Sequence, residues 1–140
     1  MRLTVYGCLL AVLIVLPFAG EVRAQDARNP AIEATIQGQF DAFRAEDFSR
    51  AFNFASPTIK GLFGTPERFG TMVQNGYPMV ANPATVRMLE LRDVADGLWQ
   101  RVMVTDQGGR THILDYQMVE TPEGWQINAV LLLPEAGVGA

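Results

Sequence analysis

The sequence has 140 residues, a formal net charge of −4, 19% charged residues and a single cysteine. This length fits one domain that is large enough to bury a hydrophobic core. Basic and acidic residues are spread along the chain without a basic run, so neither nucleic acid nor an anionic membrane surface is expected as a partner of the mature protein.

The first 24 residues have the order of regions found in a secretory signal peptide. Arg2 supplies the positive start, residues 9–16 the apolar region, residues 17–20 a helix-breaking segment and residues 22–24 a small-residue cleavage pattern. The apolar run is shorter than the roughly 20 residues of a permanent membrane span. We therefore expect cleavage before Gln25 and a periplasmic or secreted protein; an uncleaved anchor is the alternative.

Cys8 precedes the main apolar run, whereas a lipidated cysteine should follow it. Removing residues 1–24 from the 140 leaves 116 residues without cysteine, so neither a disulfide framework nor a thiol nucleophile is expected. The same removal takes away Arg2, Arg23 and Glu21, which leaves a net charge of −5. Stability must then come from burial.

A long helix is predicted to begin at Asn29-Pro30, an N-cap followed by proline at the first helical position. Its buried stripe is predicted from apolar residues at helical spacing, namely Ile32, Ile36, Phe40 and Phe43. Glu46-Asp47 should end this helix.

Three short helices should follow, each opened by a capping residue: Asp47, Ser56 before Pro57, and Thr65 before Pro66. The last of them should end at Gly76. Tyr77-Pro78 and Asn82-Pro83 predict an extended connection, because the residue before a proline is pushed out of the helical region.

Four strands are predicted over residues 85–94, 98–105, 110–120 and 125–133, with glycine-containing turns between them. The alternation in the first strand places Val86, Met88, Glu90 and Arg92 on one face. The pattern predicts an α+β fold in which N-terminal helices pack on one face of a curved, cone-like, four-stranded antiparallel sheet. Residues 25–134 form this single domain, and residues 135–140 a flexible tail.

Several segments of this sequence resemble a family of small exported bacterial proteins, of alphaproteobacterial type, whose domain has no assigned function. The resemblance rests on Asp47-Phe48, Ala51-Phe52, residues 54–59, Phe63-Gly64, Phe69, Met72-Val73, residues 76–78, residues 104–106, Gly109, Tyr116 and residues 124–128. The order of helices and strands is also similar to the cone-shaped fold of nuclear transport factor 2 and ketosteroid isomerase. The first resemblance implies no activity, and the second implies the fold alone.

Isomerases of the second kind use an aspartate base and a tyrosine in an apolar cone. No motif places these roles on residues of this chain. Asp115 and Tyr116 are adjacent in a predicted strand and should therefore point to opposite faces. This departure weakens an isomerase interpretation.

His112 is the single histidine, and no acidic residue lies at a metal-ligand spacing from it. We therefore predict no metal site, no cofactor and no catalytic set, and interpret His112 first as a structural strand residue. The predicted strands also contain polar residues that could face a ligand in the cone or form ion pairs on an exposed face: Glu90, Arg92, Arg101, Asp115, Gln117, Gln126 and Asn128.

Arg101 and Tyr116 are the first candidates for ligand contact, followed by His112 and Tyr77. The aromatic residues of the helical half could line an apolar pocket or fill the core: Phe40, Phe43, Phe48, Phe52, Phe54, Phe63, Phe69 and Tyr77.

Three hypotheses follow. The leading one is a non-catalytic exported domain that binds a small apolar or amphipathic molecule, or acts as an envelope accessory protein. The alternative is an enzyme that uses a carboxylate and Tyr116 for proton transfer in the cone. A homodimer through the sheet is a third prediction, because residues 130–133 are apolar on both faces of the last strand.

Overall fold

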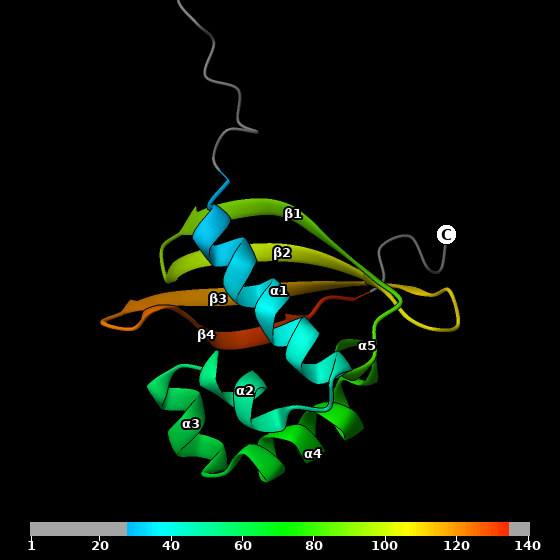
Figure 1. Ribbon diagram of the computed structural model, residues 1–140. Helices are drawn as coiled ribbons and strands as arrows, with labels where there is room; N and C mark the ends of the chain where they lie inside the picture. Colours follow the sequence, from blue (N-terminus) through cyan, green and yellow to red (C-terminus); the bar gives the residue numbers. More distant parts are fainter. Residues whose placement is uncertain (1–27, 135–140) are drawn as a thin grey trace, which may run out of the picture.

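The computed structural model describes residues 28–134, so the predicted signal peptide and C-terminal tail lie outside the described residues. Helices come first and strands second (Figure 1). The elements are α1 (Pro30–Arg44), α2 (Phe48–Asn53), α3 (Pro57–Phe63), α4 (Pro66–Gly76), α5 (Pro78–Ala81), β1 (Thr85–Val94), β2 (Gly97–Thr105), β3 (Thr111–Thr121) and β4 (Gly124–Leu132).

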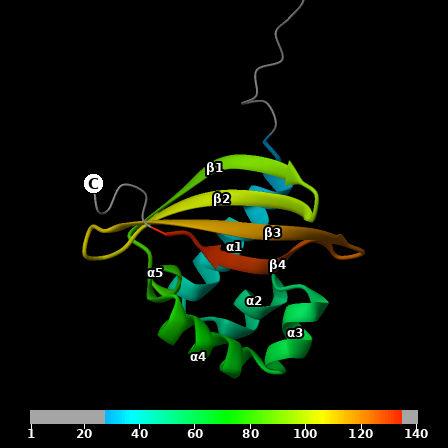
Figure 2. The ribbon, with the colours of Figure 1, turned by 180° about the vertical axis from the view of Figure 1, so that it is seen from behind.

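The four strands form one antiparallel sheet in the order β1-β2-β3-β4. Helix α1 crosses one face of this curved sheet, and α2, α3 and α4 lie together beyond the β4 side (Figure 1). No described helix crosses the opposite face, which we call the outer face (Figure 2). The predicted α+β class, with helices on one side of a curved four-stranded sheet, is therefore confirmed.

Helix α1 begins and packs as its sequence predicts. The Asn29 side chain accepts hydrogen bonds from the backbone N–H groups of Ala31 and Ile32, which caps the helix. The four apolar residues of the predicted stripe are all at most 3% exposed: Ile32, Ile36, Phe40 and Phe43. Their burial joins α1 to the inner face of the sheet in one hydrophobic core.

The short helices are fixed to the free edge of β4 by backbone hydrogen bonds. Phe54 O accepts from Ile127 N at 2.8 Å, and Ile127 O accepts from Ser56 N at 2.8 Å. Ala55 thereby forms a parallel bridge with Ile127. The segment covers a strand edge that would otherwise leave unpaired backbone groups.

Two glycines make room for phenylalanines of this segment. A Cβ at Gly70 on α4 would lie 2.7 Å from the ring of Phe48, and a Cβ at Gly38 on α1 would lie 2.6 Å from the ring of Phe54. Such distances are too short for a real side chain. The absence of a Cβ therefore lets α1 approach Phe54 at Gly38 and lets α4 approach Phe48 at Gly70.

The predicted extended connection between Tyr77 and Pro83 is wrong, because it contains α5. The N–H groups of Val80 and Ala81 donate to Tyr77 O, and that of Asn82 donates to Pro78 O at 3.1 Å. Pro78 occupies the first helical position, where its fixed φ suits a helix and its missing N–H is not needed. Tyr77 itself stays outside the helical region, as a residue before proline should.

The predicted alternation along β1 is also wrong beyond Met88. Met88 pairs with Val102 and Leu91 pairs with Gln100, so two residues of β1 lie opposite one residue of β2. This β-bulge turns Leu91, rather than Glu90, toward the core. The buried Gln100 side chain donates to the carbonyls of Leu89 and Arg101, each at 3.0 Å, and so stabilises the irregular backbone.

We expect Gly70→Ala to destabilise the fold. Overpacking against Phe48 costs about 1–3 kcal/mol, and the better helix propensity of alanine offsets about 1 kcal/mol of this cost. Gly61→Ala on α3 is the matched control, because a Cβ there meets nothing within 4 Å. Urea unfolding should show a lower midpoint for Gly70→Ala and an unchanged or higher midpoint for Gly61→Ala. Equal midpoints for the two variants would contradict the packing argument.

Candidate functional site

A cavity of about 280 Å³ lies where the helices leave the sheet. Its walls come from α1, from α3 through α5, and from the inner sides of β3 and β4. Most of the lining is apolar and includes Phe43, Ile59, Phe63, Phe69, Met72 and Val73. None of the described lining residues carries a charge. The space under the curved sheet is thus filled by core side chains along most of α1, and it is open beside the short helices.

Aromatic rings in tilted and edge-to-face contact build one wall of the cavity. Phe69 lies at the centre, with its ring centroid 5.8 Å from that of Phe43 and 5.7 Å from that of Phe63. On the core side it also contacts Phe52, at 5.4 Å between centroids. Aromatic pairs at such distances gain energy beyond the burial of their area. The aromatic residues therefore serve both of the predicted roles, as core and as cavity lining.

Helix α3 forms the outer wall of the cavity. It contains no buried residue, and Leu62 in the lining is 73% exposed. Ser56 caps the start of the helix, since its hydroxyl accepts from the N–H of Ile59 at 3.3 Å. Its partly buried side chains, Ile59 and Phe63, pack against the core, and Leu62 makes this wall an exposed side of the cavity.

Tyr116 brings a buried polar group to the cavity. It lies on β3 opposite Val130, is 1% exposed, and packs 6.1 Å from Phe40 between ring centroids. Its hydroxyl has no hydrogen-bond partner among the described residues. Burial raises the pKa of Tyr116 well above its usual range, and Tyr77 raises the pKa further. The hydroxyl is therefore neutral and keeps its proton for donation.

The other polar side chains of the lining are engaged by the protein. The Tyr77 hydroxyl donates to Val130 O at 3.4 Å, and Gln39 Nε2 donates to Ala51 O at 3.2 Å. Asn128 Oδ1 accepts from the Ser56 hydroxyl at 2.8 Å. Tyr116 differs from these three side chains in having no partner.

Of the four predicted contact residues, the structure brings Tyr77 and Tyr116 together at the cavity. His112 lies outside the cavity lining, with its Nε2 2.8 Å from Asp106 Oδ2 at the β2–β3 hairpin. The His112 hydrogen bond is the main cause that lowers the pKa of Asp106. Within residues 28–134, no three His, Cys, Asp or Glu side chains group as a metal site.

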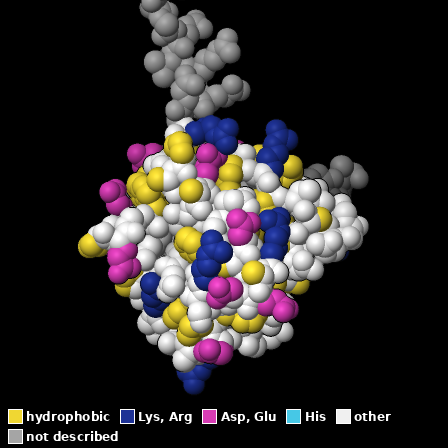
Figure 3. All heavy atoms as spheres, in the orientation of Figure 1, with side chains coloured by type: hydrophobic (Ala, Val, Ile, Leu, Met, Phe, Trp, Pro, Cys, Tyr) yellow, Lys and Arg dark blue, Asp and Glu magenta, His cyan; other side chains and the backbone are white. Residues whose placement is uncertain are grey.

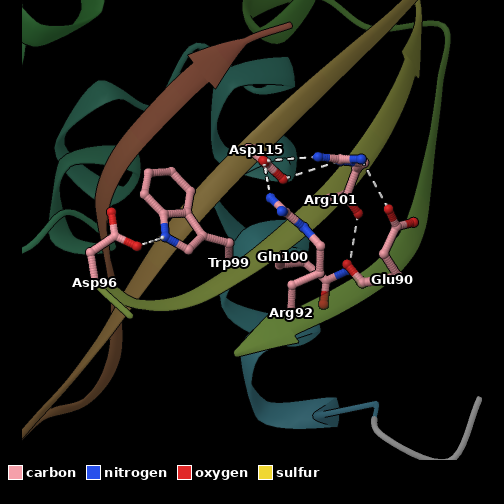
Figure 4. Close-up of polar contacts among 7 residues, drawn as sticks. All are labelled: Glu90, Arg92, Asp96, Trp99, Gln100, Arg101 and Asp115. Atoms are coloured by element: carbon pink, nitrogen blue, oxygen red, sulfur yellow. Dashed lines mark hydrogen bonds and ion pairs between the residues drawn. The ribbon is translucent and has the colours of Figure 1, made fainter. Parts of the chain in front are cut away.

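Arg101 belongs to an ion-pair network on the outer face (Figure 4). Asp115, with a side chain only 6% exposed, accepts from Arg92 Nη2 and from Arg101 Nη2, the latter at 3.2 Å. Arg101 also donates to Glu90 at 3.1 Å. The hydrogen bond to Asp115 is the main cause that raises the pKa of Arg101. For the charged residues of this network, the structure therefore shows ion pairing on the outer face, the second of the two roles considered from the sequence.

Asp115 and Tyr116 point to opposite faces, as their adjacency predicts. The edge of the outer face near the end of β4 carries Leu131, which is 50% exposed. Ion pairs occupy the centre of this face, and the exposed apolar residues among those that the structure describes there lie only at its edge. These features do not test the homodimer through the sheet, which stays a prediction. None of the helices within residues 28–134 has the length and hydropathy needed to span a membrane.

The surface on the α1 side carries charges of both signs. Lys and Arg side chains alternate with Asp and Glu side chains, and small apolar areas separate them (Figure 3). The described residues visible in this view form no continuous basic surface. This distribution agrees with the even spread of charge along the sequence.

The sequence pattern did not single out Gln39 as a lining residue, whereas Asn128 is among the strand residues that could face a ligand. Gln39 is 4% exposed although it is polar, and it lies beside the predicted apolar stripe of α1. A polar residue next to a buried stripe is a usable signal. For Asn128 the sequence leaves the face open, because its position depends on the irregular pairing of β3 with β4.

Comparison with protein families matches residues 25–140 to the family described as a domain of unknown function (DUF4864). The chain belongs to this family. The predicted resemblance to a family without assigned function is thereby confirmed. None of the curated proteins matches the chain.

Among solved structures, a phospholipid-binding protein from Ralstonia solanacearum, in complex with a phospholipid, is similar to this member of the family at 17% sequence identity. The similarity covers 73% of this chain and 75% of that chain, with a TM-score of 0.44. A likeness at this level does not assign a ligand, so the properties of the cavity follow from its own residues.

We expect Asp115→Asn to destabilise the protein, because it leaves two guanidinium groups without their shared carboxylate. Breaking a fully buried pair costs about 3–5 kcal/mol; here both arginines are partly exposed and solvated, so about 1–3 kcal/mol is expected. Asp93→Asn, on the exposed part of β1, should change stability by less than about 0.5 kcal/mol. Urea unfolding of both variants checks this, and a tolerated Asp115→Asn would show that the network is dispensable.

Proposed function

We propose that this protein binds a small apolar or amphipathic molecule in the cavity between its short helices and the sheet. The observation that carries the proposal is an apolar space of about 280 Å³ lined by aromatic and aliphatic side chains and by no described charged residue. Ligand sites are typically concave and mostly apolar, with a few polar groups that orient the ligand. Tyr116, Tyr77, Gln39 and Asn128 are the polar groups of this cavity.

The volume supports a ligand of modest size. A cavity of roughly 150 Å³ lined by aliphatic and aromatic residues accepts benzene. The space here is nearly twice as large, so a two-ring aromatic molecule or an alkyl segment fits it. A larger amphipathic molecule would leave part of its body at the exposed side beside Leu62.

The lining favours binding over catalysis. The alternative enzyme needs a carboxylate next to Tyr116, and none of the described residues that line the cavity is acidic. Asp115, the neighbouring acid in the sequence, lies on the outer face and is paired with arginine. Proton abstraction beside a carbonyl therefore has no base in this cavity.

Export completes the proposal. The N-terminal pattern over residues 1–24 is typical of a signal peptide, and the remaining chain has no cysteine. We propose that the domain acts in the periplasm or outside the cell, as a carrier of an apolar molecule or as an accessory to an envelope process. A tagged full-length chain should appear in the periplasmic or extracellular fraction with its first 24 residues removed. An intact N-terminus in the cytoplasmic fraction would contradict this part.

The binding proposal is tested with N-phenyl-1-naphthylamine, a neutral dye made of a naphthyl and a phenyl group, whose fluorescence rises in apolar surroundings. The wild-type protein should bind it saturably and should be stabilised by about 2.7 kcal/mol at a concentration of 100 Kd. Ile59→Trp should weaken binding at least about tenfold, because the larger ring fills the cavity and forfeits about 1.4 kcal/mol or more of binding energy.

Thr58→Trp is the matched control, since Thr58 lies on the same helix, is exposed and does not line the cavity. It adds the same indole without entering the space, so its dye affinity should equal that of the wild type. Saturable binding that Ile59→Trp leaves unchanged would place the dye elsewhere on the protein. No saturable binding by the wild type would contradict the proposed function.

A further inference from the structure

Tyr116 lines this cavity, and its hydroxyl is an unusual group beside it. It is buried, with less than 1 Å² of its oxygen accessible, and it has no partner among the described residues. Buried polar groups are nearly always hydrogen-bonded, and leaving one unpaired is unfavourable. A phenylalanine would supply the same ring to the core without this penalty. The hydroxyl therefore calls for a partner that the protein itself does not supply.

The surroundings of this hydroxyl restrict what that partner can be. Tyr77, Gln39 and Asn128 use their side chains in hydrogen bonds within the protein. No Lys, Arg or His is among the described residues of the lining, so nothing there would compensate a buried negative charge. An uncharged oxygen can accept from Tyr116 without that cost.

We propose that the ligand presents a neutral carbonyl-type oxygen, such as that of a ketone, ester or quinone, to the Tyr116 hydroxyl, which donates a hydrogen bond to it. This inference rests on the proposed function of the same cavity. It specifies the class of ligand: an uncharged molecule with an apolar body and one acceptor, as opposed to a hydrocarbon or a carboxylate.

The position of the hydroxyl also sets the orientation of the ligand. Tyr116 and Val130 are paired on the sheet side of the cavity, whereas Ile59 and Leu62 lie on α3 at the other side. The carbonyl end therefore enters first and lies against the sheet. The apolar body fills the space between the aromatic wall and α3, and a small movement of the lining opens the contact with the hydroxyl.

Three ligands of matched shape test the inference: 2-acetylnaphthalene, 2-ethylnaphthalene and 2-naphthoate. Their Kd values are measured by displacement of N-phenyl-1-naphthylamine from wild-type protein and from Tyr116→Phe. In the wild type, 2-naphthoate should bind at least about tenfold more weakly than the ketone, because its charge has no counter-charge in the cavity. Tyr116→Phe should raise the Kd of the ketone about fivefold, because one hydrogen bond is lost. The Kd of the hydrocarbon should change less than about twofold.

The folding of Tyr116→Phe is controlled by urea unfolding, where its midpoint should be equal to or above that of the wild type, since the change removes an unpaired hydroxyl. The carbonyl stretching band of bound, ¹³C-labelled ketone gives a second measurement on wild-type protein alone. It should lie at lower frequency than in hexane, as for a hydrogen-bonded carbonyl. A band at the hexane position would overturn the inference.

The outcomes separate the inference from the function on which it rests. If the ketone and the hydrocarbon bind and Tyr116→Phe affects both equally or neither, the assignment of the carbonyl partner is wrong while the cavity still binds apolar molecules. The same conclusion follows if 2-naphthoate binds as tightly as the ketone. If none of the three ligands displaces the dye from the wild type, or if Ile59→Trp binds all of them as well as the wild type, both proposals fail.

Discussion

Two backbone hydrogen bonds at Ile127 fix the segment between α2 and α3 to the edge of the sheet, and the position of the short helices depends on them. They place residues 54–56 along the free edge of β4, so α2 ends and α3 begins directly beside the strand. Phe48, the first residue of α2, fits against Gly70, and Phe54, directly after α2, fits against Gly38. The short helices are attached at this edge and do not lie flat on the sheet, so a space is left between α3, α4 and β4.

Strand β3 carries an uncharged polar residue on its cavity side and a charged residue on its outer side. Tyr116 faces the cavity and has no partner, whereas Asp115 faces outward and is shared by two arginines. Four charged strand residues thus pair with one another on the outer face: Glu90, Arg92, Arg101 and Asp115. The cavity keeps only uncharged polar groups, and this separation makes it suited to neutral ligands.

The sequence accounts well for the elements and less well for the site. Capping residues and proline positions predict α1, α3 and α4 almost to the residue, because caps act through neighbours in the chain. Tyr77 and Tyr116 were predicted as contact residues and lie together at the cavity, but Arg101 and His112 do not join them. A strand residue is assigned to one of two faces by alternation, and alternation alone does not show which face lines a cavity.

By itself, the sequence determined the α+β class, the order of the elements and the opposite orientation of Asp115 and Tyr116, since each follows from local spacing. Tertiary structure alone decided the bulge at Leu89 and Glu90 and the hollow beside α3. These features arise from contacts between residues far apart in the chain: Gln100 supports the bulge, and Ile127 holds the segment that opens the cavity. No local pattern encodes such a pairing, so the unpartnered hydroxyl of Tyr116 becomes visible only in the folded protein.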